Sequence, residues 1–318
     1  MTSLTPSSES QLPAVALIEK TNGVSAAVKL SICIPAYHDD PTSLITALTL
    51  QTGANASELL IYDDGSDDAD MAARIEGAIL KFPGPARYIN ARQNSGRSAA
   101  RNRLVCAATS EWVLFIDADM LPDSVDFLSK YIGLTEQQKT PAVIAGGFSL
   151  KQVKPGANQK LHAAQAKRSD CIPANRRALD PGRFVFSSNI VVHKQVLRTV
   201  EFDEQFSGWG WEDVDWGLRV AHVFPILHVE NTATHLGLEP DDVLIRKFGS
   251  SGPNYARLVH NHPTATRRMK LTFMSGMMRN WPFVAGASRM VALHRNLPLP
   301  VRLFALKLYR ARMYANHL

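Results

Sequence analysis

Two carboxylates separated by one small residue, Asp117 and Asp119, are the groups in this chain best placed to do chemistry. They directly follow five apolar residues at 112–116 (WVLFI), a pattern typical of a strand buried on both faces of a parallel sheet. Ligands of open α/β sheets bind beyond the carboxyl ends of the strands, where these aspartates would emerge. Their oxygens favour Mg²⁺ or Mn²⁺, which also grips phosphates. A solvated turn before a helix near Pro122 is the alternative.

A second acidic cluster, 63–68 (DDGSDD), follows another apolar run at 59–62. Both clusters would lie on one edge of the predicted sheet, where unpaired carboxylates repel each other unless a cation or donor groups neutralise them. The helix start at 94–97 (NSGR) and Arg101 would add groups suited to a diphosphate on the same side. A helix-capping turn would explain 63–68 alone. Together the clusters favour a site for phosphate, metal and nucleoside.

Strand and helix patterns alternate through the first 120 residues. The predicted strands are 30–37, 59–62, 87–90 and 112–116, with helical patterns between them over 41–48, 71–82 and 95–108. This alternation predicts an α/β fold with a mostly parallel central sheet and right-handed crossovers. A chain of 318 residues would hold one large or two small domains.

The composition is that of a globular protein, with 45% hydrophobic and 20% charged residues. Cys33, Cys106 and Cys171 have no metal-like spacing and fit a reducing compartment. Residues 1–28 lack the uninterrupted apolar core of a signal peptide, and we expect a disordered lead-in there. The apolar stretch 271–293 is interrupted by Arg, Asn and Pro, which makes it a poor membrane-spanning helix.

The charge is unevenly distributed. No Asp or Glu follows Asp242, while thirteen Lys and Arg lie between residues 246 and 312. We expect 256–318 to be a basic helical tail, broken at Pro282 and 298–300, that meets an anionic membrane surface. A docking surface for a partner subunit is the alternative. No basic recognition helix or aromatic platform supports a nucleic-acid partner, and we expect none.

Five motifs, in their order along the chain, resemble those of family-2 glycosyltransferases of GT-A fold. They are 31–37 (SICIPAY), 63–66 (DDGS), 94–102 (NSGRSAARN), 117–119 (DAD) and 206–215 (FSGWGWEDVD) with Arg219. The last is similar to the acceptor segment of chondroitin-polymerase-like and galactosyltransferase-like enzymes. The resemblance covers 29–255 and implies a GT-A domain there, with a nucleotide-sugar half at 29–120 and an acceptor half at 140–255.

The resemblance also implies roles for individual residues. The donor-binding residues would be Pro35, Ala36, Tyr37, Asp63, Asp64, Asn94, Arg101 and Asp117. Pro35, Ala36 and Tyr37 would line the base pocket, Asp64 would hydrogen-bond the base, and Arg101 would approach the diphosphate. The acceptor-binding residues would be Ser188, Asn189, Trp209, Trp211 and Glu212. Trp209 would stack on a sugar and Glu212 would orient sugar hydroxyls.

Asp213 would be the general base. A sugar hydroxyl is a poor nucleophile, so a carboxylate must take its proton as the new bond forms. Glycines beside Trp209 and Trp211 would let the chain bend toward one cavity, although core packing is the alternative for both tryptophans. Asp215 is expected to pair with Arg219 one helical turn on.

The metal, Mn²⁺ or Mg²⁺, would be held by Asp119 and Asp117. His228 and His235, on a predicted strand at 224–235, are candidates for a third ligand, and His235 better matches the family's post-strand histidine. The family spacing differs after that histidine. The segment 248–253 (FGSSGP) is predicted to be a flexible loop, with a lid as an alternative.

These features predict an inverting, metal-dependent glycosyltransferase that uses a nucleotide diphosphate sugar, with UDP-sugars favoured. The expected acceptor is a glycan or lipid-linked molecule in surface-polysaccharide synthesis, at the inner face of the plasma membrane. A catalytically silent sugar-nucleotide-binding subunit is the alternative, although such a subunit needs no base at Asp213. A nucleotidyltransferase is disfavoured, because no Lys-bearing Gly-rich loop lies near the first strand.

Overall fold

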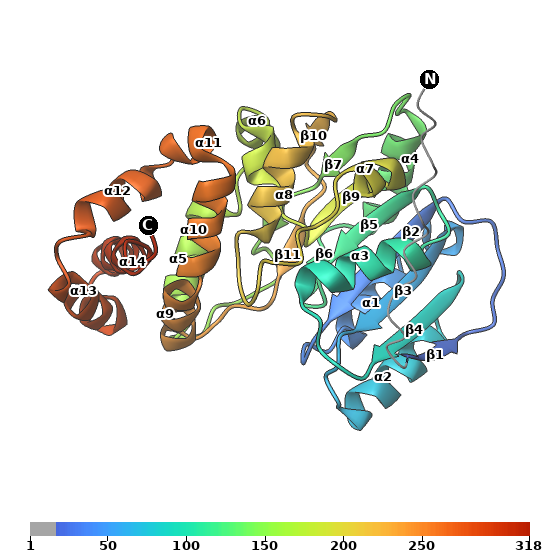
Figure 1. Ribbon diagram of the computed structural model, residues 1–318. Coiled ribbons are helices and arrows are strands. Elements are labelled where there is room, and N and C mark those ends of the chain that lie inside the picture. The colour runs from blue at the N-terminus through green and yellow to red at the C-terminus, as the bar shows by residue number, and fades with distance from the viewer. Residues whose placement is uncertain (1–16) are drawn as a thin grey trace, which may run out of the picture.

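A large, mostly parallel sheet forms the centre of the computed structural model, which describes residues 17–318 (Figure 1). Its strands are β1 (Leu17–Thr21), β2 (Leu30–Ala36), β3 (Ser57–Asp63), β4 (Ala86–Ala91), β5 (Trp112–Ile116), β7 (Val143–Ala145), β9 (Asn189–His193) and β10 (Ile226–His228). Their spatial order is β1-β4-β3-β2-β5-β9-β7-β10. Strands β2 to β5 pair in parallel, and β9 runs antiparallel to both β5 and β7. The predicted α/β fold is confirmed.

The parallel register gathers the strand ends that carry the acidic motifs. In β2, Ala36 lies opposite Asp63 of β3, and Cys33 lies opposite Phe115 of β5. Because these strands point the same way, the residues after each of them emerge at one edge of the sheet. Asp64 and Asp117 therefore share that edge, as the sequence predicts.

Helices cover both faces of the sheet, so each strand alternates between two cores. Leu114 and Ile116 face the core covered by the first group, α1 (Thr42–Thr49), α2 (Ala69–Ile79) and α4 (Phe127–Glu136). Val113 and Phe115 face the core covered by the second group, α3 (Arg97–Ala107), α7 (Lys194–Thr199) and α8 (Glu212–Val220). A short 3₁₀ turn, η1 (Ala54–Ala56), leads into β3. Burial on two faces explains the continuous apolar strand sequences.

A small second sheet carries the histidine of the candidate site. It consists of β6 (Met120–Pro122), β8 (Phe148–Ser149) and β11 (Ala233–His235), with β11 in the middle. The single strand predicted at 224–235 is wrong, because the chain leaves the large sheet after β10 and enters the small one at β11. Between them, the Asn231 carbonyl oxygen accepts a hydrogen bond from Asn189 Nδ2. The helix predicted to start just after Pro122 begins at Phe127 instead.

The first described residues belong to the sheet. β1 pairs antiparallel with β4, with Leu17 opposite Ala91. The Asn22 side chain then accepts a hydrogen bond from the Ala86 amide at 3.0 Å and donates one to the Gly84 carbonyl at 2.9 Å. The predicted disordered lead-in is therefore wrong for residues 17–22, because their strand partner, β4, lies far away in the sequence. Its first sixteen residues lie outside the described range.

The C-terminal part of the chain is helical, and α5 from the middle of the chain packs against it. These helices are α5 (Lys160–Ser169), α9 (Asp241–Ser250), α10 (Gly252–Asn261), α11 (Pro263–Arg267), α12 (Lys270–Met278), α13 (Phe283–Leu293) and α14 (Leu299–Tyr314). The predicted breaks at Pro282 and 298–300 are confirmed, since α13 and α14 begin there. Within residues 17–318, no helix has the combined length and apolar character needed to cross a bilayer.

The tail is joined to the rest of the protein more closely than the sequence indicates. α14 contacts α5, α9 and α10, and Figure 1 shows it surrounded by the other C-terminal helices. The predicted boundary after residue 255 falls inside α10. The loop predicted at 248–253 is helical, and Ser251 is buried because its hydroxyl bonds to Tyr314 and to the Phe248 carbonyl.

Arg177 holds together the segments at the ends of β7 and β10, at one edge of the large sheet. It lies at the end of α6 (Ala174–Arg177), just before the 3₁₀ turn η2 (Pro181–Phe184), and it is fully buried. Its guanidinium donates to the backbone carbonyl oxygens of Ala145, Gly146, Ile172 and Val229. One side chain thus joins β7, the segment after β10 and α6.

We predict that Arg177→Met destabilises the fold by about 3 kcal/mol, because it removes four hydrogen bonds to backbone carbonyls and leaves those of Ile172 and Val229 without a donor among residues 17–318. The free energy of unfolding in urea measures this. Arg176→Met is the matched control, since Arg176 is exposed one position away, and it should change the free energy by less than about 0.5 kcal/mol. Equal unfolding midpoints for the two variants would refute the role assigned to Arg177.

Candidate active site

Asp117 is held by a buried arginine. Its Oδ1 accepts a hydrogen bond from Arg101 Nη2 at 2.6 Å, and Arg101, on the second turn of α3, is only 2% exposed. The backbone amide of Asp117 donates to the Ser188 carbonyl oxygen at 3.4 Å. The structure therefore brings together two of the predicted donor-binding residues at the end of β5.

Asp119 lies against His235. Its Oδ2 is 3.0 Å from His235 Nε2, because β11 runs beside β6 and places His235 opposite Met120. Burial alone would raise the pKa of Asp119, but the hydrogen bond and the charge of His235 outweigh it and lower that pKa. Gly237 is required here, since a Cβ at this position would lie 2.0 Å from Asp119 Oδ2.

The donor atoms of this pair suit a divalent metal in their chemistry. Carboxylate and imidazole ligands are compatible with Mn²⁺, and carboxylates suit Mg²⁺. Within residues 17–318, no group of three or more His, Cys, Asp or Glu side chains is arranged as a metal cage. Asp119 and His235 form a pair, while Asp117 faces Arg101. The metal role of all three stays a prediction that fits their donor chemistry.

His228, the second histidine candidate, lies elsewhere. Its Nδ1 is 2.8 Å from Arg177 Nη1, and its Nε2 is 3.0 Å from the Pro181 carbonyl oxygen. Both ring nitrogens are thus occupied away from Asp119. Hydrogen bonding within the fold accounts for this residue.

Asp213 has little support from other side chains, although the Ser187 hydroxyl lies near enough to lower its pKa. It lies in the first turn of α8, and its Oδ1 is buried with no hydrogen-bond partner among the described residues. Burial and the neighbouring charge of Glu212 raise the pKa of Asp213 to about 6, against the opposing charge of Arg101. A carboxylate with a pKa near neutral pH can accept a proton and still be ionised.

Arg97 lies between the donor and acceptor sides, at the helix start that the sequence predicts to suit a diphosphate. It is the first residue of α3, and its Nη1 lies 3.7 Å from Glu212 Oε1. Burial would lower the pKa of Arg97, but the surrounding carboxylates raise it; they are Glu212, Asp117, Asp213 and Asp119. The sequence indicated a diphosphate role for this helix start, but not the contact of Arg97 with Glu212.

Two predicted donor-binding aspartates are engaged in holding loops. Asp63 is fully buried and accepts hydrogen bonds from Ser66 and from the Tyr88 hydroxyl. Asp64 accepts hydrogen bonds from the backbone amides of Ser95 and Gly96 at 2.8–3.0 Å. The turn-forming alternative thus describes what these side chains do in the structure. A contact of either with a nucleotide base stays a prediction.

The remaining donor residues lie around the same edge. Tyr37 follows β2 with 45% of its surface exposed, Pro35 is half-buried and Ala36 is buried. Asn94 is exposed just before α3. An exposed aromatic ring beside an open helix start is compatible with the predicted base pocket, and this assignment stays a prediction.

Several predicted acceptor residues have packing roles instead. Asn189 is buried, with its amide donating to the Gly147 and Asn231 carbonyl oxygens and its Oδ1 accepting from the Tyr131 hydroxyl. Its neighbour Ser188 is also buried. The Asn189 side chain is therefore occupied within the protein, where it fixes the segment at which β9 begins, while an acceptor role for Ser188 stays a prediction.

Trp211 packs against the tail. Its Nε1 donates to the Tyr314 hydroxyl at 3.1 Å, its ring centroid lies 4.7 Å from that of Tyr255, and Arg310 lies over its face. Trp209 is half-buried beside the Phe248 ring. The packing alternative therefore accounts for Trp211, and acceptor stacking stays a prediction for Trp209.

The pairing expected of Asp215 is confirmed. Its Oδ2 lies 2.8 Å from Arg219 Nε, and its Oδ1 accepts hydrogen bonds from Asn261 and is 2.9 Å from His262 Nε2. Asp215 thus ties α8 to α10 and is unavailable for proton transfer.

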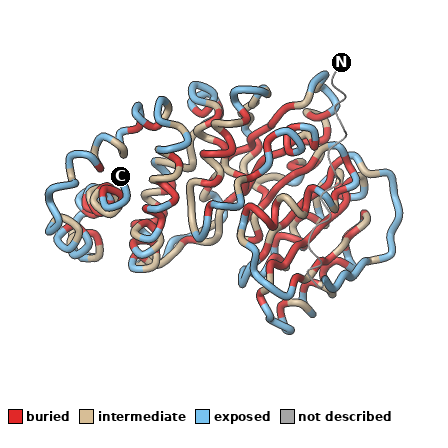
Figure 2. Tube along the Cα trace, in the orientation of Figure 1, coloured by how far each residue is buried: buried red, intermediate tan, exposed pale blue. Residues whose placement is uncertain are grey.

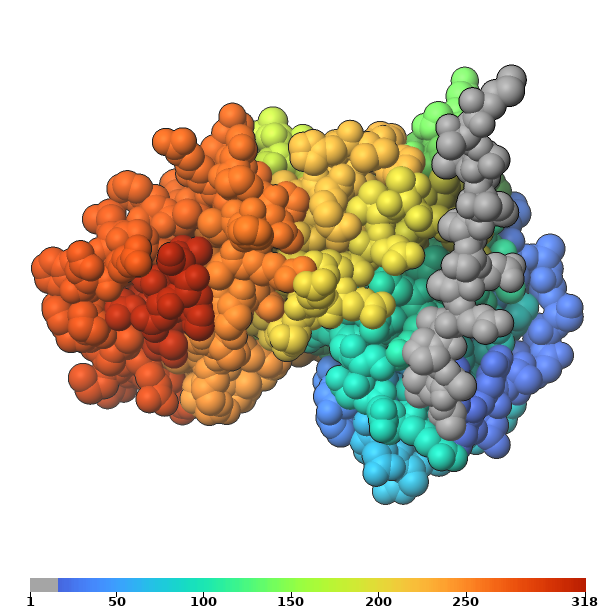
Figure 3. Space-filling model, viewed as in Figure 1, coloured from blue at the N-terminus to red at the C-terminus, as the bar shows by residue number. Residues whose placement is uncertain are grey.

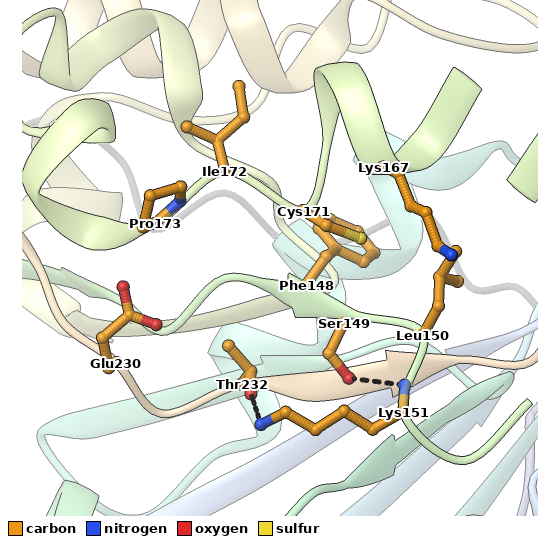
Figure 4. Close-up of a pocket in the computed structure, with 10 residues that line it drawn as sticks. All are labelled: Phe148, Ser149, Leu150, Lys151, Lys167, Cys171, Ile172, Pro173, Glu230 and Thr232. Atoms are coloured by element: carbon orange, nitrogen blue, oxygen red, sulfur yellow. Dashed lines mark hydrogen bonds between the residues drawn. The ribbon is translucent and has the colours of Figure 1, made fainter. Parts of the chain in front are cut away.

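A cavity of about 420 Å³ opens beside the small sheet (Figure 4). It is lined by Phe148, Ser149, Leu150, Lys151, Lys167, Cys171, Ile172, Pro173, Glu230 and Thr232. The Phe148 ring joins it to the candidate site, with its centroid 5.8 Å from that of His235. No sequence motif indicated this cavity, because its walls come from separate segments.

Comparisons with known proteins agree with this arrangement. Residues 31–200, more than half of the chain, match the family described as Glycosyl transferase family 2. The uncharacterized glycosyltransferase YfnE of Bacillus subtilis is 24% identical over 61% of this chain and 60% of its own length. Chondroitin synthase of Escherichia coli is 27% identical over 60% of this chain but only 32% of its own length. The chain thus spans less than two thirds of either relative.

Two solved structures share the fold. A mannosyltransferase from Pyrobaculum calidifontis, in complex with GDP-Man and Mn²⁺, superposes with a TM-score of 0.59 at 13% identity, covering 92% of this chain and 90% of that one. Glucosyl-3-phosphoglycerate synthase from Mycobacterium tuberculosis, in complex with Mn²⁺, UDP and glucosyl-3-phosphoglycerate, gives a TM-score of 0.51 at 18% identity, covering 73% of this chain and 79% of that one. This chain therefore belongs to glycosyltransferase family 2 and has the GT-A fold.

Proposed function

We propose that this chain transfers a sugar from a nucleotide diphosphate sugar to a hydroxyl of a glycan or lipid-linked acceptor, with inversion at the transferred sugar. The observation that carries the proposal is Asp213, a carboxylate with a buried, unpartnered oxygen and a raised pKa beside a cluster of arginines. An inverting transfer is one displacement, which needs a base for the acceptor hydroxyl and no nucleophile from the protein.

The donor would lie across the N-terminus of α3. Gly96 has a φ of 95° and leaves open space at the start of that helix, and Arg97 and Arg101 add positive charge. A helix N-terminus and guanidinium groups stabilise the negative charge that develops on a departing diphosphate. We favour a UDP-sugar, from the family resemblance of the base pocket at Tyr37 and Asp64.

Asp119 and His235 would hold Mn²⁺ or Mg²⁺, with Asp117 as the further carboxylate. A divalent ion supplies charge stabilisation to the leaving diphosphate. The two similar folds described above contain Mn²⁺, which supports metal use by this fold. In this chain, Arg101 orients Asp117, and Gly237 leaves room for Asp119 beside His235.

We place the reaction in surface-polysaccharide synthesis at the inner face of the plasma membrane. The resemblance to polysaccharide-synthesising enzymes and the acid-free tail support this placement. The alternative is a catalytically silent subunit that binds a nucleotide sugar. Asp213 speaks against it, because a binding subunit gains nothing from a buried carboxylate without a partner.

We predict that Asp213→Asn lowers donor turnover at least about a hundredfold, since an amide cannot accept the acceptor proton. Turnover and binding of a panel of UDP-, GDP- and dTDP-sugars, with candidate acceptors, would measure this. Asp242→Asn, an exposed substitution in the first turn of α9, is the matched control and should keep full activity. Full turnover by Asp213→Asn would remove Asp213 as the base, while binding should survive the substitution.

The pH profile of the wild type gives a separate prediction. The carboxyl of Asp213 takes up a proton as the pH falls through about 6, and the neutral acid cannot act as a base. We therefore expect kcat/KM to fall about tenfold per pH unit below about 6 and to level off above it. A profile that stays flat down to pH values near 4, the usual range of a carboxyl group, would contradict the raised pKa.

We also predict that Asp119→Ala abolishes metal-dependent donor binding, whereas Asp213→Asn retains it. Calorimetry with each nucleotide sugar, with and without Mn²⁺, would measure the difference. Gly237→Ala should weaken the same binding, because its methyl group would displace the Asp119 carboxylate. Gly133→Ala, at a helical glycine with open space around it, should not. Unchanged Mn²⁺ dependence in Asp119→Ala would exclude this metal site.

A further inference from the structure

The end of the molecule formed by α12 and α13 exposes large apolar side chains. They are Phe273 (69% exposed), Met277 (55%), Trp281 (52%), Phe283 (65%) and Met290 (72%), and we call them the tail surface. Figure 2 shows α12 and α13 mostly in the colours of exposed and intermediate residues, and Figure 3 shows this end lying opposite β1 and α2. Single exposed apolar side chains are common, but a group of large ones at one end of a protein marks an interaction surface.

The spacing of these residues places them on shared helix faces. Phe273 and Met277 lie one turn apart on α12, and Phe283 and Met290 lie two turns apart on α13. Trp281 bridges the two helices, with its ring centroid 5.6 Å from that of Phe283. Trp is favoured where one side of a ring is apolar and the other is wet.

Positive charge without a counter-charge surrounds the tail surface. Lys270, Arg279 and Arg289 are exposed and form no ion pair with a carboxylate in the described part of the chain. Nearby on α11, Arg267 and Arg268 line a hollow of about 340 Å³. No acidic residue follows Asp242, so no negative charge of the tail opposes an anionic partner.

Other basic residues of the tail have structural partners, which sharpens this contrast. Arg302 is buried and donates to Asp241 Oδ2 at 2.6 Å and to the Ala292 carbonyl oxygen at 2.8 Å. Arg257 pairs with Asp203 at 2.8 Å. The exposed cations of α12 and α13 thus lack the partners that Arg257 and Arg302 have, as does Lys307 of α14 in the described part of the chain.

We propose that the tail surface binds an anionic lipid bilayer, with α12 and α13 lying in the plane of the interface. Phe, Met and Trp would enter the boundary between headgroups and acyl chains, while Lys and Arg contact lipid phosphates. A bilayer fits better than a protein partner, because it needs only apolar depth and negative charge and no matched hydrogen bonds. Because the tail has no acidic residue, none of its side chains would repel an anionic bilayer.

The tail surface is fixed to the catalytic part of the protein. Arg302 joins α14 to α9 and α13, and Arg312 Nε donates to the Trp281 carbonyl oxygen at 3.2 Å. Docking would thus hold the whole GT-A domain at a set orientation to the membrane. That this serves a lipid-linked acceptor rests on the proposed function, whereas the lipid contact itself does not.

The test is co-sedimentation of the full chain with vesicles of phosphatidylcholine, with or without phosphatidylglycerol. We expect binding to the vesicles that contain phosphatidylglycerol, weakened by salt, and little binding to phosphatidylcholine alone. The double variant Phe273→Ser, Phe283→Ser and the double variant Arg279→Gln, Arg289→Gln should each bind at least about tenfold more weakly. Trp281→Phe should lose part of the blue shift in fluorescence that vesicles cause.

Matched controls lie on the opposite end of the molecule. Leu80→Ser removes an equally exposed apolar side chain (67%), and Lys139→Gln removes an exposed cation, so both should bind as the wild type does. Asp213→Asn should also bind normally, which separates this test from catalysis. The proposal fails if the wild type does not sediment with the anionic vesicles, if the tail variants bind fully, or if Leu80→Ser loses as much binding. Thermal unfolding confirms that each variant is folded.

Discussion

Charge balance at one end of the sheet is the constraint on which the candidate site depends. Asp117, just after β5, and Glu212, in the first turn of α8, converge there. Without neutralising groups, the repulsion between such carboxylates would push the two segments apart. Arg101 holds Asp117, and Arg97 lies beside Glu212, so α3 supplies the cations that let the segments meet. A nucleotide diphosphate would bring further negative charge to the same place. Because both arginines already face protein carboxylates, a divalent cation bound with the donor would supply the positive charge that balances its diphosphate.

Most acidic and amide groups of the sequence motifs are satisfied within the protein. Asp63, Asp64 and Asn189 form hydrogen bonds to backbone groups and to side-chain hydroxyls, and these bonds fix the loops that surround the site. Asp213 differs, because one of its oxygens is buried without a partner. Burying such a group costs stability, so its retention is explained more readily by chemistry than by folding. Motif membership alone does not separate these two kinds of residue.

Local patterns predicted much of the fold. The apolar runs gave the parallel strands, Pro282 marked a helix break, and the spacing of Asp215 and Arg219 gave their ion pair, because each depends on residues close in the sequence. The wrong predictions all depended on distant partners. Ser251 lies between α9 and α10, where its hydroxyl hydrogen-bonds to the Tyr314 hydroxyl. Asn22 helps to hold β1 on the sheet by accepting a hydrogen bond from the Ala86 amide. Arg101 and the helix start at Arg97 were predicted for the donor, but their pairing with Asp117 and Glu212 was not, because it depends on residues distant in the sequence.

The C-terminal helices belong to the site's architecture as well as to the surface. Trp211 immediately precedes Glu212 and has a φ of 80°, a left-handed conformation that costs a non-glycine residue roughly 1–2 kcal/mol. Its ring and its indole N–H are held by Tyr255, Arg310 and Tyr314, which offset that cost. The start of α8 is thus set partly by α14. A family-2 domain cut before α14 would therefore lose the Arg310 and Tyr314 contacts that hold this turn.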